Sequence, residues 1–80
     1  MTETEVYNKV VDLIAERFEV KADQLSRSTN IKNDLAADSI DLVEFVLELE
    51  DTFGGEIPDD EAEKLNTIDD VVKYIVAHQA

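Results

Sequence analysis

Apolar residues recur at helical spacing in separate stretches of this chain, and this pattern restricts the possible folds more than any other feature. Apolar side chains three and four positions apart share one face of a helix, whereas a half-buried strand alternates apolar and polar residues. Neither strand alternation of useful length nor an internal repeat occurs. The sequence therefore predicts an all-α protein.

The first helix has a clear start signal and is followed by a long loop. Thr2 and Glu5 have capping-box spacing, and the apolar residues that follow predict a helix over about residues 4–17. Residues 19–37 are more polar and lose the helical period, with room for a short turn near residues 23–25. A loop of this length is unusual in a compact domain and often has a function. Isolated apolar residues are expected to anchor it to the bundle: Val20, Leu25, Ile31 and Leu35.

The second helix is the most apolar stretch of the chain. Asp38 or Ser39 is expected to cap its start, because a side-chain oxygen there can accept a hydrogen bond from an unpaired backbone N–H. Gly54 follows the last periodic residue, so the helix should end near Phe53. The residues expected to face the core are Leu42, Phe45, Val46, Leu49 and Phe53.

The last third of the chain predicts a short helix and a longer one. Pro58 to Leu65 is a short helical candidate with acidic residues at its start. Thr67 and Asp70 have cap spacing for a final helix that ends around Ala77. The predicted fold is a small four-helix bundle with three longer helices, a short third helix, and the long loop between the first two.

Composition limits the size, the chemistry and the location of this protein. Its 80 residues, 44% of them hydrophobic, suit a single domain over residues 1–80, expected to be monomeric. The chain has no cysteine, which excludes disulfides and a thiol nucleophile of its own. The acidic first residues lack the pattern of a signal peptide, and no apolar run approaches membrane-spanning length. A cytoplasmic protein without membrane insertion is the simplest interpretation.

The net charge of −13 restricts the partners of the chain. Phosphates would be repelled, so nucleic acid is not an expected partner, and proteins that present Lys and Arg are. Twelve acidic residues and no Lys or Arg lie between residues 33 and 63. These carboxylates show no calcium-loop spacing, and no metal site is predicted.

The second helix places an acidic stripe beside apolar residues. On a helical wheel, one arc holds Asp41, Glu44, Glu48 and Asp51, and the residues bordering it are Ile40, Val43 and Leu47. The arrangement has two interpretations. It is a solvated face beside an ordinary core edge, or it is a docking surface that seats apolar contacts and carboxylates against a basic patch.

Ser39 opens this helix within the triplet Asp38-Ser39-Ile40, which resembles the Asp-Ser-Leu signature of the acyl carrier proteins. The resemblance extends over nearly the whole chain: Asp34-Leu35, Ile40-Asp41, Val43-Glu44, Leu49-Glu50, Phe53, Glu56-Ile57-Pro58-Asp59, Glu61-Ala62-Glu63 and His78-Gln79-Ala80. Ile40 departs from the family's leucine, and Ala37 replaces the commoner glycine before Asp38.

The resemblance implies a carrier and not an enzyme. In that family the matching serine bears a 4′-phosphopantetheine arm, donated from coenzyme A by a separate magnesium-dependent transferase, and the arm holds acyl groups as thioesters. Ser39 would be the attachment point and Asp38 would frame the modification site. The resemblance implies docking to the transferase and to fatty acid synthesis enzymes with basic patches, through Ile40, Asp41, Glu44, Leu47 and Glu48.

Other functions remain as alternatives. Carriers for polyketide, peptidyl or D-alanyl transfer share the serine-led helix, and an unmodified acidic helical adaptor would bind basic partners through the same face. A serine hydrolase has no support, because the sole histidine, His78, lies near the end of the chain and is too remote to serve as a base for Ser39. No catalytic residue is predicted.

Overall fold

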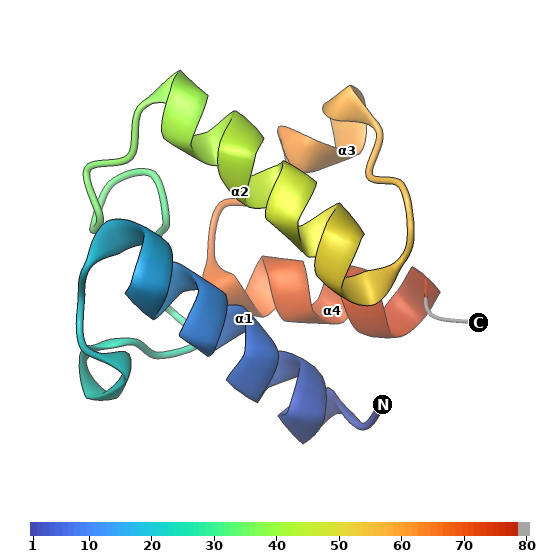
Figure 1. The fold of residues 1–80 in the computed structure, drawn as a ribbon, viewed down its shortest axis with the longest axis horizontal. Coiled ribbons are helices and arrows are strands. Elements are labelled where there is room, and N and C mark those ends of the chain that lie inside the picture. Colours follow the sequence, from blue (N-terminus) through green and yellow to red (C-terminus); the bar gives the residue numbers. More distant parts are fainter. Residues whose placement is uncertain (79–80) are drawn as a thin grey trace.

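The computed structural model describes residues 1–78 and confirms the predicted all-α fold with three longer helices and one short one (Figure 1). The Gln79-Ala80 part of the family-like ending lies outside the described residues. The elements, in chain order, are α1 (Glu3–Phe18), the 3₁₀ turn η1 (Ala22–Gln24), α2 (Ser39–Phe53), α3 (Asp59–Ala62) and α4 (Ile68–His78). None of the helices in residues 1–78 is long and apolar enough to cross a bilayer.

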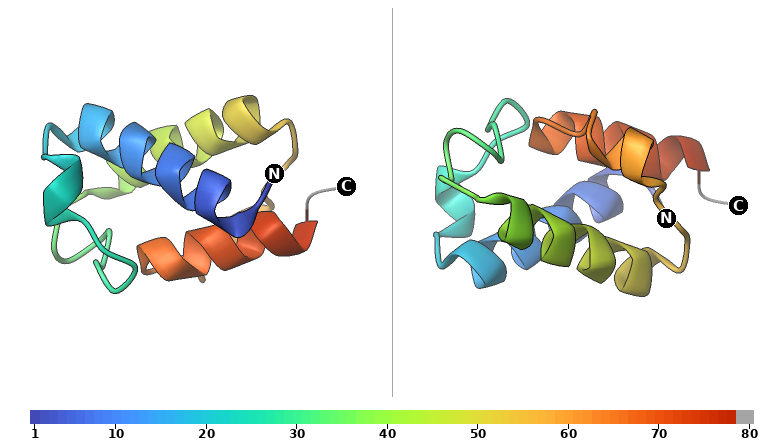
Figure 2. Two further views of the ribbon diagram at one scale, coloured as in Figure 1. Left: turned by 90° about the horizontal axis from the view of Figure 1, so that it is seen from below. Right: turned by 90° about the horizontal axis from the view of Figure 1, so that it is seen from above.

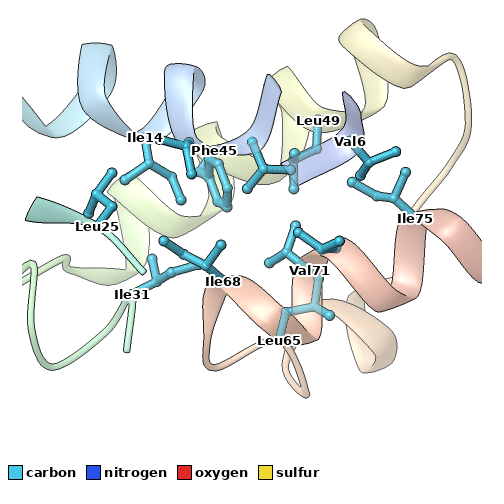
Figure 3. Packing of buried hydrophobic residues seen from close by; sticks show 13 residues of the cluster. Val6, Ile14, Leu25, Ile31, Phe45, Leu49, Leu65, Ile68, Val71 and Ile75 are labelled. Atoms are coloured by element: carbon cyan, nitrogen blue, oxygen red, sulfur yellow. The ribbon is translucent and has the colours of Figure 1, made fainter. Parts of the chain in front are cut away.

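The three longer helices surround one apolar core (Figures 2 and 3). Each of them contributes one apolar face, because residues at helical spacing point the same way. Of the five α2 residues expected to face the core, Phe45 and Leu49 are buried and the other three are half-buried. The fully enclosed side chains of the core include Val6, Val10, Ile14, Ile31, Ile68, Val71 and Val72.

Capping boxes fix the starts of α1 and α4 as predicted. The Thr2 hydroxyl accepts a hydrogen bond from the Glu5 N–H at 3.2 Å, and the Glu5 carboxylate accepts one from the Thr2 N–H at 2.9 Å. Thr67 and Asp70 make the same reciprocal pair, with both distances 3.1 Å. Each pair satisfies two backbone N–H groups that the helix itself leaves unpaired.

The short third helix is shorter than the predicted span of Pro58 to Leu65. It covers four residues, Asp59–Ala62, and the backbone then tightens. The N–H groups of Lys64 and Leu65 donate to carbonyls three residues earlier, which is 3₁₀ bonding rather than α-helical bonding. This tightening brings Leu65 into the core, where it is buried.

The long loop is tied to the connection between α3 and α4. The Ile31 N–H donates to the Asn66 carbonyl at 2.8 Å, and the Ile68 N–H donates to the Thr29 carbonyl at 3.1 Å. This short antiparallel pairing holds the loop beside the start of α4. All four expected anchors contact the core: Leu25 and Ile31 are buried, and Val20 and Leu35 are half-buried.

Arg27 joins the same loop to two helices. Its guanidinium lies 2.7 Å from a carboxylate oxygen of Glu3, in the first turn of α1, and 2.7 Å from one of Asp69, in the first turn of α4. The guanidinium also lies over the ring of Tyr7, 5.3 Å from its centroid. Arg27 therefore holds the starts of α1 and α4 together.

The start of α1 and the end of α4 lie at one end of the molecule, and α2 begins at the other end (Figures 1 and 2). Met1 and His78 line one small hollow of about 230 Å³, together with residues at the end of α2. The fold therefore separates both ends of the described chain from Ser39.

Candidate functional site

The start of α2 presents Ser39 in an exposed position on a well-formed helix end. Asp38 is the N-cap, which resolves the choice between Asp38 and Ser39. Its carboxylate accepts a hydrogen bond from the Asp41 N–H at 2.9 Å, and the Asp41 carboxylate accepts one from the Asp38 N–H at 3.4 Å. Ser39 is therefore the first helical residue, and its side chain is exposed.

Two backbone N–H groups remain beside the Ser39 hydroxyl. The capping box uses the N–H groups of Asp38 and Asp41, and the first backbone bond of the helix runs from the Leu42 N–H to the Asp38 carbonyl. The N–H groups of Ser39 and Ile40 take no part in either arrangement. Unpaired N–H groups at a helix start favour a phosphate, which offsets part of the repulsion from Asp38 and Asp41. A phosphate ester on Ser39 fits this helix end.

The approach to Ser39 is a structured turn. The Asn30 side-chain oxygen accepts hydrogen bonds from the N–H groups of Lys32, at 3.0 Å, and Asn33, at 2.9 Å. The Asp34 carboxylate accepts one from the Asn30 N–H at 2.8 Å. Asx turns of this kind fix the direction of a chain that carries no helix of its own.

The left-handed residue in this approach is Ala36, with φ of 51°. The family resemblance places its commoner glycine at Ala37, directly before Asp38. Ala37 does not have positive φ, and the strain of an L-residue in the left-handed region lies one position earlier.

Three large apolar side chains stand exposed on one side of α2. Ile40 is 66% exposed, Val43 59% and Leu47 58%. Val43 was not assigned to the docking set, although the helical period placed it between the other two. Together they form an apolar strip that starts next to Ser39.

A positively charged side chain from another helix pairs with the acidic stripe beside this strip, although residues 33–63 contain no Lys or Arg. Arg17, in the last turn of α1, lies 2.7 Å from a carboxylate oxygen of Glu44 through Nη1 and pairs with Glu48 through Nη2. These carboxylates raise the pKa of Arg17, Glu48 more than Glu44. Packing α1 against α2 therefore brings a positive charge to this face from a distant part of the sequence. Within residues 1–78, no group of three acidic or histidine side chains is placed to hold a metal ion.

An apolar groove of about 500 Å³ runs from Ser39 along α2 toward α3. The Glu50 carboxylate accepts a hydrogen bond from the Ile57 N–H at 2.8 Å and so fixes the chain that leads into α3. The groove reaches core residues such as Phe45 and Leu65. Other apolar residues that line it include Leu42, Val46, Ile57 and Ala62.

His78 lies away from this site, as its position in the sequence predicted. It is exposed in the last turn of α4, where its ring stacks on Tyr74 with centroids 4.1 Å apart. Its Nδ1 lies 2.8 Å from the Tyr74 carbonyl. Nothing in this arrangement brings an imidazole to the Ser39 hydroxyl.

Comparisons with known proteins converge on one family. A family model described as "Phosphopantetheine attachment site" matches residues 8–75. The chain is 62% identical to the acyl carrier protein of Lactobacillus acidophilus and 57% identical to that of Lactobacillus johnsonii, in each case over 99% of both chains. Among solved structures, the acyl carrier protein from Enterococcus faecalis is 51% identical, with a TM-score of 0.85 over the full length of both chains.

Proposed function

This chain belongs to the acyl carrier proteins, a family defined by a phosphopantetheine attachment site, and we propose that Ser39 is the residue to which its arm is attached. The observation that carries the proposal is the position of Ser39. It is exposed as the first residue of α2, directly after the N-cap Asp38 and within the reciprocal capping box of Asp38 and Asp41, and it lines the apolar groove. The single domain over residues 1–80 stays a prediction.

The attachment chemistry needs little from this chain besides a reachable hydroxyl. Ser39 Oγ would form the new bond to phosphorus, the bond from phosphorus to the nucleotide part of coenzyme A would break, and the hydroxyl proton would pass to the transferase. Asp38 holds the helix start in place through its bond from Asp41. The arm, once bound, supplies the thiol that this cysteine-free sequence does not have.

The carrier role follows from the family, and its pathway is our proposal. We assign it to fatty acid biosynthesis for two reasons. The chain is strongly acidic, with a net charge of −13, and its sequence match with the acyl carrier proteins of the two Lactobacillus species covers 99% of both chains. The chain itself would catalyse no reaction and would act as a monomer in the cytoplasm. The docking set remains Ile40, Asp41, Glu44, Leu47 and Glu48.

The groove supports a further role in shielding the acyl chain. A thioester held near Ser39 would have its hydrocarbon tail next to Leu42, Val46 and Leu65. Burial of each CH₂ group is worth about 0.8 kcal/mol, so a tail of several carbons has a clear reason to enter. The structure already has an open groove, although filling the core beyond it would still displace side chains.

Intact mass tests the attachment. The protein is incubated with coenzyme A, magnesium and a phosphopantetheinyl transferase, and one arm should be added. Ser39→Ala should abolish the addition. Ser26→Ala and Ser28→Ala are matched controls, since both serines are exposed in the loop, and both variants should be modified like the parent. Addition of an arm to Ser39→Ala would show that the site is elsewhere, and no addition to the parent would favour the unmodified acidic adaptor.

A further inference from the structure

Arg17 joins α1 to the docking face through two carboxylates. Its Nη1 and Nη2 atoms pair with Glu44 and Glu48, and its side chain is only 19% exposed. Its Nε is buried and has no hydrogen-bond partner within residues 1–78. The guanidinium is therefore held in this position by two bonds at its outer edge.

These two carboxylates belong to the docking set proposed above. Each carboxylate can accept only a few hydrogen bonds from charged donors. When a basic partner approaches Glu44 and Glu48, both carboxylates are already paired with the Arg17 guanidinium. Arg favours carboxylates because its planar fork offers several donors in fixed geometry. A partner's Lys or Arg must therefore share these oxygens with Arg17 or displace it.

Release of Arg17 leaves α1 and α2 in contact. Phe18 and Phe45 meet edge to face, with ring centroids 6.5 Å apart, and Phe45 is buried. Aromatic packing of this kind does not depend on the ion pairs. The ion pairs can therefore exchange partners while the two helices stay packed.

We propose that Arg17 is an internal competitor for the docking carboxylates, and that it lowers the affinity of basic partners by occupying Glu44 and Glu48. The inference rests on the proposed function, because it assumes that the transferase docks on α2. By this proposal Arg17, which belongs to α1 and not to the docking set, lowers the affinity of docking. When a partner binds, its Lys or Arg then replaces Arg17 at Glu44 and Glu48. No ion pair is added to carboxylates that were unpaired before.

Steady-state kinetics of the transferase test this inference. Arg17→Gln removes the competing charge and should lower KM for the unmodified protein by about 2- to 5-fold at low salt, the range expected when exposed ion pairs are exchanged. The value of kcat should stay unchanged. The difference in KM between the parent and Arg17→Gln should become smaller as the salt concentration is raised, because salt screens exposed charges.

Arg27→Gln is the matched control. It removes the same charge and also two ion pairs, but its partners are Glu3 and Asp69 rather than residues of α2. An equal fall in KM for both variants would assign the effect to net charge and would overturn the inference. An unchanged or raised KM for Arg17→Gln, with normal arm addition to the parent, would also overturn it while leaving the proposed function intact.

A measurement on the unmutated protein covers the case in which Arg17→Gln does not fold. The Nε–Hε resonances of Arg17 and Arg27 are followed by NMR while inactive transferase is added. We expect the Arg17 signal to move with the α2 amide signals and the Arg27 signal to stay in place. Movement of the α2 amides without movement of Arg17 would show that the ion pairs persist in the complex, which contradicts competition.

Discussion

Asp38 and Asp41 cap the start of α2 reciprocally, each carboxylate accepting a hydrogen bond from the backbone N–H of the other residue. Two acidic residues beside the proposed modification site therefore have a structural role that does not depend on any partner. Asp41 was assigned to docking from the sequence, and its carboxylate also serves the cap. Substitutions at these positions change the helix start and the proposed docking face together.

Asp38→Ala should lower the free energy of unfolding by about 0.5–2 kcal/mol, the usual cost of losing an N-cap oxygen. Urea unfolding monitored by circular dichroism measures this change. Asp51→Ala is the control, because Asp51 is exposed near the other end of the same helix. A loss of equal size in both variants would show that the cap of α2 contributes little.

Ala36→Gly should stabilise the protein by up to about 1 kcal/mol. Glycine removes the cost of the left-handed backbone, about 1–2 kcal/mol, but adds freedom to the unfolded chain. Ala37→Gly should destabilise by about 0.4–1 kcal/mol, because that residue has no positive φ to relieve. Thermal melts of the two variants give the comparison, and the opposite order would show that the strain is not at Ala36.

Gly54→Ala should cost about 1–2 kcal/mol, although the added methyl group has space. Gly54 caps the end of α2 with φ of 76°, and a Cβ there would meet no atom within 4 Å, so the cost comes from the backbone alone. Gly55→Ala, which also has open space and no positive φ, should be neutral or stabilising by up to about 1 kcal/mol. Similar melting temperatures for the two variants would contradict this assignment.

Asp69→Asn should destabilise the protein at pH 7 and have less effect in acid. The Arg27 guanidinium, and after it the Lys73 ammonium, lower the pKa of Asp69 below its usual value. A carboxylate with a lowered pKa in the folded state contributes stability above its unfolded pKa, and this contribution is lost as the pH falls through the folded value. Urea midpoints at pH 7 and pH 3 test the trend, with Asp12→Asn on the exposed side of α1 as control. If the urea midpoints of the parent and Asp69→Asn differ as much at pH 3 as at pH 7, the ion pairs of Asp69 with Arg27 and Lys73 are not the source of the difference.

Glu44→Gln combined with Glu48→Gln should raise the transferase KM by about 2- to 10-fold at low salt, the range for losing two exposed ion pairs with a partner. Glutamine is preferred to lysine, because lysines at these positions would face Arg17 and disturb the contact between α1 and α2. The control is the double variant Asp12→Asn with Asp23→Asn, which also removes two negative charges but at exposed positions outside the docking set. Equal kinetics for the two double variants would remove Glu44 and Glu48 from the docking set.

The sequence predicted the helices and the position of Ser39 because these depend on nearby residues. Capping spacing at Thr2 and Thr67, a cap residue at Asp38 or Ser39, and the apolar period marked the three longer helices. Packing between distant segments was not predictable in the same way. Neither the pairing of Arg17 with α2 nor the backbone strain at Ala36 has a local sequence signal, because each arises only when the chain is folded.

The separation between the chain ends and Ser39 has a consequence for fusion proteins. The start of α1 and the end of α4 share one end of the molecule, so a tag, a surface linker or a second protein attached there would lie away from the start of α2. Ser39 and the apolar strip next to it would stay open to a large enzyme. The fold can therefore be immobilised or inserted into a longer polypeptide through its ends, with the serine still facing solution.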